Sequence, residues 1–184
     1  MAPREDAGVL LRDADPDDCP QIQALYADHV IHGLASFEEV PPDLTEMERR
    51  LQAAQSRGLP YLVAETAENS GELIGFASAG PYRTRPAYRF TLENTVYVRR
   101  DQGGRGIGSL LLGTLIERCE NLGYRQMIAV IGDSANEASI RLHRRHGFQQ
   151  MGCLCAIGFK HGRWLDSVLM QRPLGQGDGT LPAS

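Results

Sequence analysis

A glycine-rich segment between a strand and a helix is the feature of this sequence that most restricts its fold. The segment that starts at Gln102 reads QGGRGIG; it follows the strand-like stretch VYV and precedes a run with helical apolar spacing. Glycines let the backbone turn tightly and aim successive N–H groups outward, and the helix adds the positive end of its dipole. Such a junction can bind a phosphate or pyrophosphate, to which Arg105 adds a positive charge.

Two familiar phosphate-binding patterns fit this loop poorly. A P-loop ends in Gly-Lys-Ser or Gly-Lys-Thr, and neither tripeptide occurs in the sequence. The dinucleotide fingerprint G-x-G-x-x-G can be threaded loosely through Gly104 and Gly106, but the loop lies in mid-chain after several strands, and no acidic residue follows at the required place. Taken alone, the loop leaves open a plain turn that only starts a helix.

Length and composition predict a single globular domain. The chain has 184 residues, of which 42% are hydrophobic and 23% charged, and a net charge of −4. A mildly acidic chain gives no global footprint for nucleic acid or for an anionic membrane, so we expect neither partner. The sequence has no apolar run of bilayer length and no secretory leader, which predicts a cytoplasmic protein. We expect one domain over residues 1–174 and a flexible tail over 175–184.

The cysteines predict no metal site. Cys153 and Cys155 form a C-x-C pair, and residues two apart on a strand point to the same face. However, no second pair of cysteines or histidines has the spacing of a zinc finger, and Cys19 and Cys119 stand alone. We therefore expect four reduced thiols that are mostly buried.

Apolar periodicity predicts an α/β fold that contains both strand directions. The expected strands lie near 8–12, 61–65, 73–79, 87–98, 127–131, 149–160 and 164–171, and the expected helices near 15–30, 42–54, 107–122 and 136–146. In the strand over 87–98, alternation places Glu93 on one face and Asn94 on the other.

A second pattern follows about thirty residues after the glycine loop. It reads N-x-x-S-x-x-L-H-x-x-x-G-F from Asn136, and its spacing puts Asn136, Ser139 and His143 on one face of a helix. The order of strand, glycine loop, helix, strand and this pattern resembles the GNAT superfamily of acyl-CoA-dependent N-acetyltransferases.

The resemblance is closest to the phosphinothricin N-acetyltransferase branch, which includes enzymes that act on methionine sulfoximine. It runs from about Val9 to Leu174. The stretches that carry it are ASFEEVPP at 35–42, GPYRTRPAYRFTLENTVYV at 80–98, AVIGDSANEASIRLHRRHGF at 129–148 and GFKHGRWLDSVLMQ at 158–171. It implies a mixed, mostly antiparallel central sheet of about six to seven strands flanked by about four helices.

The resemblance also implies a site for acetyl-CoA. The strand end would bind the pantetheine arm, the loop the pyrophosphate, and the second pattern the pantetheine side. The residues implied are Val96, Tyr97, Val98, Gly103, Gly104, Arg105, Gly106, Ile107, Gly108, Asn136 and Ser139. One position departs from the superfamily pattern [QR]-x-x-G-x-[GA], because Gly103 stands where Gln or Arg is usual. A charge-assisted contact is then expected from Arg105.

For catalysis, the resemblance implies Glu93 as the base and His143 as the donor of a proton to the leaving thiolate. An ammonium nitrogen has no lone pair, so a proton must leave before the amide forms. A glutamate with the ordinary pKa of about 4.3 is too weak a base unless burial raises its pKa or a water relays the proton. No cysteine lies in a motif suited to an acyl-enzyme, so the amine is expected to attack directly in a ternary complex.

The acceptor is expected to be a small amino-acid-like amine. Arg83, Arg85 and Tyr88 precede the base and could receive an anionic group, although such a run is often solvated surface. Phe37 could be a wall of the substrate site or a core residue. The alternatives are acetylation of protein N-termini, peptides or other amines, and a non-catalytic acyl-CoA sensor. Members of the branch pair as homodimers, and the same is expected here.

Overall fold

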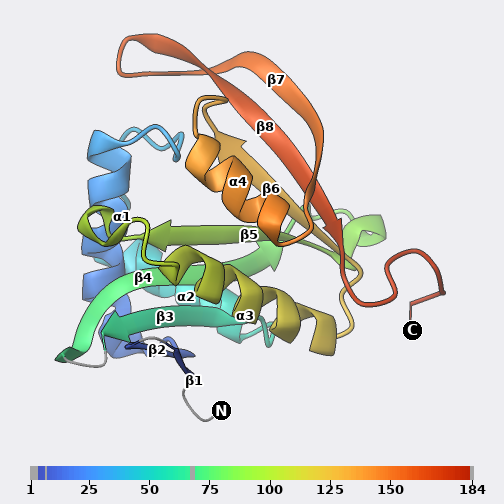
Figure 1. Ribbon diagram of the computed structural model, residues 1–184, viewed down its shortest axis with the longest axis horizontal. Helices are drawn as coiled ribbons and strands as arrows, with labels where there is room; N and C mark the ends of the chain where they lie inside the picture. The colour runs from blue at the N-terminus through green and yellow to red at the C-terminus, as the bar shows by residue number, and fades with distance from the viewer. Residues whose placement is uncertain (1–3, 7, 67–68, 183–184) are drawn as a thin grey trace.

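The computed structural model describes residues 4–6, 8–66 and 69–182, and these form one sheet with helices on both faces (Figure 1). The strands run in the order β1-β2-β3-β4-β5-β6-β8-β7. Their bounds are β1 (Arg4–Asp6), β2 (Val9–Asp13), β3 (Tyr61–Thr66), β4 (Asn69–Pro81), β5 (Thr91–Val98), β6 (Gln126–Gly132), β7 (Gln149–Lys160) and β8 (Arg163–Pro173). Neighbouring strands are antiparallel except β5 and β6, which are parallel.

The α-helices are α1 (Cys19–His32), α2 (Leu44–Gln55), α3 (Ile107–Asn121) and α4 (Glu137–Arg145). Side chains mark where two of them begin: Asp43 accepts a hydrogen bond from the Glu46 N–H at the start of α2, and Asn136 accepts one from the Ser139 N–H at the start of α4. Helix α3 begins without a side-chain cap, directly after Gly106, whose φ of 82° favours glycine. The first N–H groups of α3 are therefore available to a ligand.

Two helices lie on each face of the sheet. The ring of Tyr97 on β5 packs edge-on against Tyr26 of α1, with centroids 5.0 Å apart. The next residue, Val98, points to the other face, where a Cβ on Gly108 of α3 would lie 3.6 Å from it. Helix α4 shares the α3 face, and α2 packs beside α1 (Figure 1). Apolar residues of α3 that are no more than 1% exposed fill the core under the sheet: Ile107, Leu111, Leu112, Leu115 and Cys119.

The two parallel strands pair only briefly. Their register covers Thr91↔Gln126, Leu92↔Met127 and Glu93↔Ile128, whereas β5 continues to Val98 and β6 to Gly132. Beyond Glu93 the strands separate, so the edge of β5 that faces β6 has no strand partner there. This split is what opens a site in the middle of the sheet.

The structure confirms the α/β class with a mostly antiparallel mixed sheet and four flanking α-helices among the described residues. It adds β1, which the polar sequence RED did not indicate because it has no apolar alternation. It also shortens the expected strand over 87–98: Pro86–Tyr88 forms a 3-10 turn closed by bonds from the N–H groups of Tyr88 and Arg89. Proline at its first position favours that turn over a strand.

Three other predictions concern the burial of the cysteines, the absence of a membrane-spanning helix and the segment after residue 174. Cys19 and Cys119 are buried as predicted, but Cys153 and Cys155 are exposed on β7, so that part of the prediction was wrong. No helix in the described part of the chain is long and apolar enough to cross a membrane. In the segment after residue 174, Thr180 and Leu181 accept hydrogen bonds from the guanidinium of Arg125.

Candidate active site

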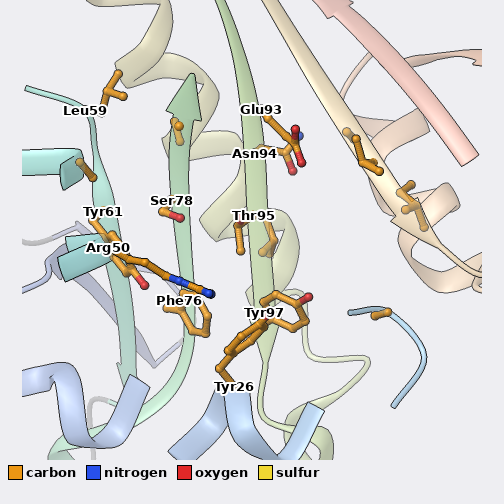
Figure 2. Close-up of a pocket in the computed structure, with 18 of the residues that line it drawn as sticks. Tyr26, Arg50, Leu59, Tyr61, Phe76, Ser78, Glu93, Asn94, Thr95 and Tyr97 are labelled. Carbon is orange, nitrogen blue, oxygen red and sulfur yellow. The ribbon is translucent and has the colours of Figure 1, made fainter. Parts of the chain in front are cut away.

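A cavity of about 620 Å³ opens where β5 and β6 separate. Figure 2 shows its floor on β4 and β5, with side chains of α1, α2 and β3 around it. The lining also includes Ser139 and His143 of α4 and the residue that caps it, Asn136, on the other face of the sheet. The cavity therefore reaches both faces through the split, so a molecule on the α3–α4 side could meet one on the α1–α2 side.

Glu93 lies on the cavity floor at the last position of β5 that pairs with β6. Its side chain is half-buried, and this burial raises the pKa of its carboxyl group. Among the hydrogen bonds of the described residues, none engages this carboxylate. It is therefore free to take a proton from a ligand, and its raised pKa makes it a better base than an exposed glutamate.

His143 lies below the split with both ring nitrogens near acceptors. Its Nδ1 is 2.8 Å from the carbonyl oxygen of Ser139, and its Nε2 is 3.1 Å from Oδ1 of Asn94. The amide nitrogen of Asn94 donates to the carbonyl of Ile128 on β6, which fixes the orientation of that amide. These two acceptors favour a ring that is protonated at both nitrogens.

Burial acts in the opposite direction. His143 is only 4% exposed, and this burial lowers its pKa, while the bond to the Ser139 carbonyl raises it. Burial is the larger effect, so the pKa of His143 lies below the ordinary value of histidine.

Asn94 is a residue whose role the sequence analysis missed. It is 8% exposed and joins β5, β6 and α4 at the point where the strands part. A signal was present, since it is a polar residue between Leu92 and Val96 on the face that alternation predicts to be buried. Its partner on α4 could not be identified from the sequence.

The glycine loop has the predicted form. Gly104 and Gly106 have φ values of 79° and 82°, a left-handed conformation that other residues rarely adopt. Gly108 lies close to the neighbouring elements, where a Cβ would be 3.4 Å from the Leu142 side chain. Arg105 donates to the Gln102 side chain, and both remain on the surface of the loop.

The predicted cofactor residues divide into two groups. Those that line the cavity are Val96, Tyr97, Asn136 and Ser139. Those outside its lining, at the end of β5 and in the loop before α3, are Val98, Gly103, Gly104, Arg105, Gly106, Ile107 and Gly108. The second group surrounds the uncapped N-terminus of α3, as expected for binding the more distant, charged part of a ligand.

Phe37 lines the cavity, whereas the other predicted acceptor residues do not. Arg83, Arg85 and Tyr88 lie in the turn that follows Pro81, itself a lining residue at the end of β4. The guanidinium of Arg83 stacks over the Tyr88 ring at 5.7 Å. These three residues therefore follow a lining residue closely in the sequence, but they are not part of the cavity wall.

A cationic wall that the sequence did not reveal comes from α2 and the turn that follows it. Arg49, Arg50 and Arg57 all line the cavity. Arg50 is only about a third exposed, and it donates to Glu38 and to Glu46 at 2.8 Å each. In Figure 2 its guanidinium points inward above the floor of the cavity. Nothing in the sequence indicated this wall, because the polar face of α2 resembles an ordinary solvated helix face.

The 35–42 segment is held in place by β7. The ammonium group of Lys160, a residue that is 2% exposed, donates to the Ser36 carbonyl at 2.8 Å. The Ser36 hydroxyl is 2.8 Å from that of Tyr26 on α1. Phe37 packs directly on Gly158, where an added Cβ would lie 2.5 Å from the phenyl ring. Any side chain at residue 158 would therefore displace Phe37 from the cavity wall.

The split parallel pair, the uncapped α3 with its glycine loop, and the cavity that crosses the sheet define the acyl-CoA-dependent class of acyltransferase folds. Residues 23–148 match the model of the acetyltransferase (GNAT) family. The chain belongs to this family.

Its similarity to individual proteins extends over most of the chain. It is 58% identical over 166 residues to a phosphinothricin N-acetyltransferase of Alcaligenes faecalis, covering 90% of this chain and 83% of that protein. It is 45% identical to an L-methionine sulfoximine/L-methionine sulfone acetyltransferase of Pseudomonas paraeruginosa, covering 88% and 92%. The crystal structure of a phosphinothricin acetyltransferase from Sinorhizobium meliloti with acetyl-CoA superposes with a TM-score of 0.92, at 46% identity, covering 96% and 94%.

Proposed function

We propose that this protein transfers the acetyl group of acetyl-CoA to the α-amine of a small amino acid of the phosphinothricin or methionine sulfoximine/sulfone type. The observation that carries the proposal is the cavity through the split sheet, which joins Glu93 on one face to His143 on the other. The relatives named for these substrates support the acceptor class.

The residues on the α3–α4 face suit acetyl-CoA. Backbone groups of β5 between Val96 and Val98 have no partner on β6, so they can pair with the amides of pantetheine. The N–H groups of the loop and of the first turn of α3 can bind the pyrophosphate. When bound there, acetyl-CoA supplies a thioester carbonyl, which N–H groups of β5 can polarise.

We assign one of the two proton transfers to Glu93 and the other to His143. Glu93 faces the α1–α2 side, from which the acceptor enters, and takes the proton that the amine must lose. His143 faces the other side and gives a proton to the departing thiolate, while Asn94 holds its ring in position. The amine attacks the thioester directly, with no acyl-enzyme.

The cationic wall of α2 favours an acceptor that carries its own anionic groups. Phosphinothricin offers a carboxylate and a phosphinate in addition to its amine, and we propose that Arg83, Arg85, Tyr88 and Phe37 complete its binding. A cationic aminoglycoside would be repelled by such a wall. A sensor without activity has no need of a buried carboxylate open to the acceptor side.

The acceptor class is tested by comparing kinetics on methionine sulfone, phosphinothricin, a neutral amino-acid amide and a short peptide, with thiol release as the readout. We expect the first two to be acetylated with much the higher kcat/KM. Arg83→Ala should raise KM for these two far more than for the amide, because it removes a charge that only they engage. Preference for the peptide, with the first two inert, would move the protein to N-terminal acetylation.

We propose that the protein is a cytoplasmic homodimer that acts on small molecules and has no nucleic-acid or membrane partner. Five apolar side chains of the β7–β8 hairpin are between 47% and 66% exposed: Met151, Leu154, Ile157, Phe159 and Trp164. Figure 1 shows this hairpin extending beyond the rest of the fold. So large an apolar surface on one element is typical of an interface, and the occupant we propose is a second copy related by two-fold symmetry.

Light scattering at micromolar concentration should therefore give the mass of a dimer. Trp164→Glu should shift the mass toward the monomer, because it places a charge in the apolar interface. Leu122→Glu is the matched control, since Leu122 is also an exposed apolar residue but lies at the C-terminal end of α3, on a different element from the hairpin. A monomeric wild-type protein would contradict the prediction.

A further inference from the structure

Two exposed thiols and a carboxylate meet on the β7–β8 hairpin, outside the active-site cavity. The Sγ atoms of Cys153 and Cys155 and a carboxylate oxygen of Asp166 all lie within 4.8 Å of one another. The two cysteines are exposed in the single chain, so a solute can reach them there before a second copy covers the hairpin. None of the three residues lines the cavity, so the acetyl-transfer site does not account for them.

A break in strand pairing brings these groups together. Leu154 pairs with Ser167 and Gly158 pairs with Leu165, which leaves three residues of β7 against one residue of β8. Within this bulge Ala156 has a φ of 51°, a left-handed conformation that is rare outside glycine. Bulges are sites where a strand redirects a side chain. Here the bulge lies next to Asp166.

Asp166 is held in position by two hydrogen-bond donors. The N–H of Ala156 donates to its Oδ1 at 2.9 Å, and the Ser134 hydroxyl donates to its Oδ2. Hydrogen bonds from an outer shell orient a ligating carboxylate in the same way at metal sites.

The spacing is close to that of a metal-ligand set. Tetrahedral zinc, with Zn–S of about 2.3 Å and Zn–O of about 2.1 Å, places two sulfurs about 3.8 Å apart and sulfur and oxygen about 3.6 Å apart. Thiolates select thiophilic ions over magnesium and calcium, which prefer oxygen.

We propose that Cys153, Cys155 and Asp166 bind one thiophilic divalent cation, such as zinc, with a fourth position open to water. Binding takes place by loss of the two thiol protons to solvent and formation of two metal–sulfur bonds and one metal–oxygen bond. The site is separate from acetyl transfer, and its occupancy does not depend on which acceptor the enzyme uses.

Calorimetric titration of the reduced, metal-free full-length protein with zinc chloride tests the proposal. We expect one zinc per chain, with affinity lowered at least tenfold in Cys153→Ser and in Asp166→Asn, because each removes a ligand. His32→Ala is the matched control: His32 and Asp28 form an exposed pair 3.8 Å apart on α1 that could bind zinc weakly. This variant should bind zinc as the wild type does.

Cobalt provides a second readout that does not depend on heat. Cobalt bound by thiolates gives a sulfur-to-metal charge-transfer band, which we expect in the wild type and in His32→Ala but not in Cys153→Ser. Circular dichroism confirms that each variant is folded, and Cys155→Ser replaces any variant that is not. Absence of zinc binding, half a zinc per chain, or undiminished binding in the cysteine variants would overturn the proposal.

Discussion

Replacing Glu93 by Gln is expected to lower kcat by about 10²–10⁴-fold, the usual cost of losing a general base. The amide keeps the size of the side chain and its place on the cavity floor but cannot accept the proton of the amine. The affinity for acetyl-CoA should stay nearly unchanged, because the groups proposed to bind it lie on the other face of the sheet. Steady-state kinetics and calorimetry with acetyl-CoA measure these two effects separately.

The pH profile gives the same prediction a second test. Burial raises the pKa of Glu93, so its basic form is lost at a higher pH than that of an ordinary glutamate. The wild-type rate should therefore fall as the pH drops through this raised pKa, and the fall should disappear in Glu93→Gln. His143→Ala should cost less rate, because a thiolate is a tolerable leaving group even without a proton donor. A Glu93→Gln enzyme with nearly full rate at neutral pH would show that Glu93 is not the base.

The parts of the fold that follow local rules were predictable from the sequence. Glycines in left-handed conformations at residues 104 and 106 were implied by a loop that must turn sharply into a helix. Likewise, the spacing of Asn136, Ser139 and His143 placed them on one face of α4, and all three line the cavity. Apolar periodicity and the residue preferences of turns depend on residues that are close together in the chain, so both can be recognised in a single sequence.

The rest depends on contacts between distant segments. The split between β5 and β6 is set by where their pairing stops, after Glu93↔Ile128, and neither strand's sequence marks that point. Asn94 meets His143 only because α4 packs under this split. In the sequence, Arg50 looks like a surface residue. In the structure, α2 packs beside the cavity, and ion pairs with Glu38 and Glu46 hold the Arg50 guanidinium in its wall.

Replacing Arg50 by Met is expected to raise KM for phosphinothricin and methionine sulfone at least 100-fold. Methionine keeps the apolar stem but removes the inward guanidinium from the cavity wall (Figure 2). It also leaves Glu38 without its cation, and the remaining Arg49 and Arg57 only balance Glu38 and Glu46, so the wall that faces an anionic acceptor loses its net positive charge. Truncating one partner of a fully buried charge pair typically costs 2–5 kcal/mol, roughly 30- to several-thousand-fold, and because Arg50 is about a third exposed we expect a loss in the lower half of this range.

The neutral amino-acid amide provides the comparison that isolates this charge effect. Its KM should change much less in Arg50→Met, because it brings no anion to the wall. Arg49→Met is the matched control, since Arg49 also comes from α2 and pairs with Glu46, but its side chain is 66% exposed at the cavity rim. Solvent screens such an exposed charge, so this variant should shift KM only a few-fold. An equal rise in KM for the amide would show that Arg50 maintains the shape of the cavity rather than binding the acceptor's anion, because a structural defect acts on every acceptor alike.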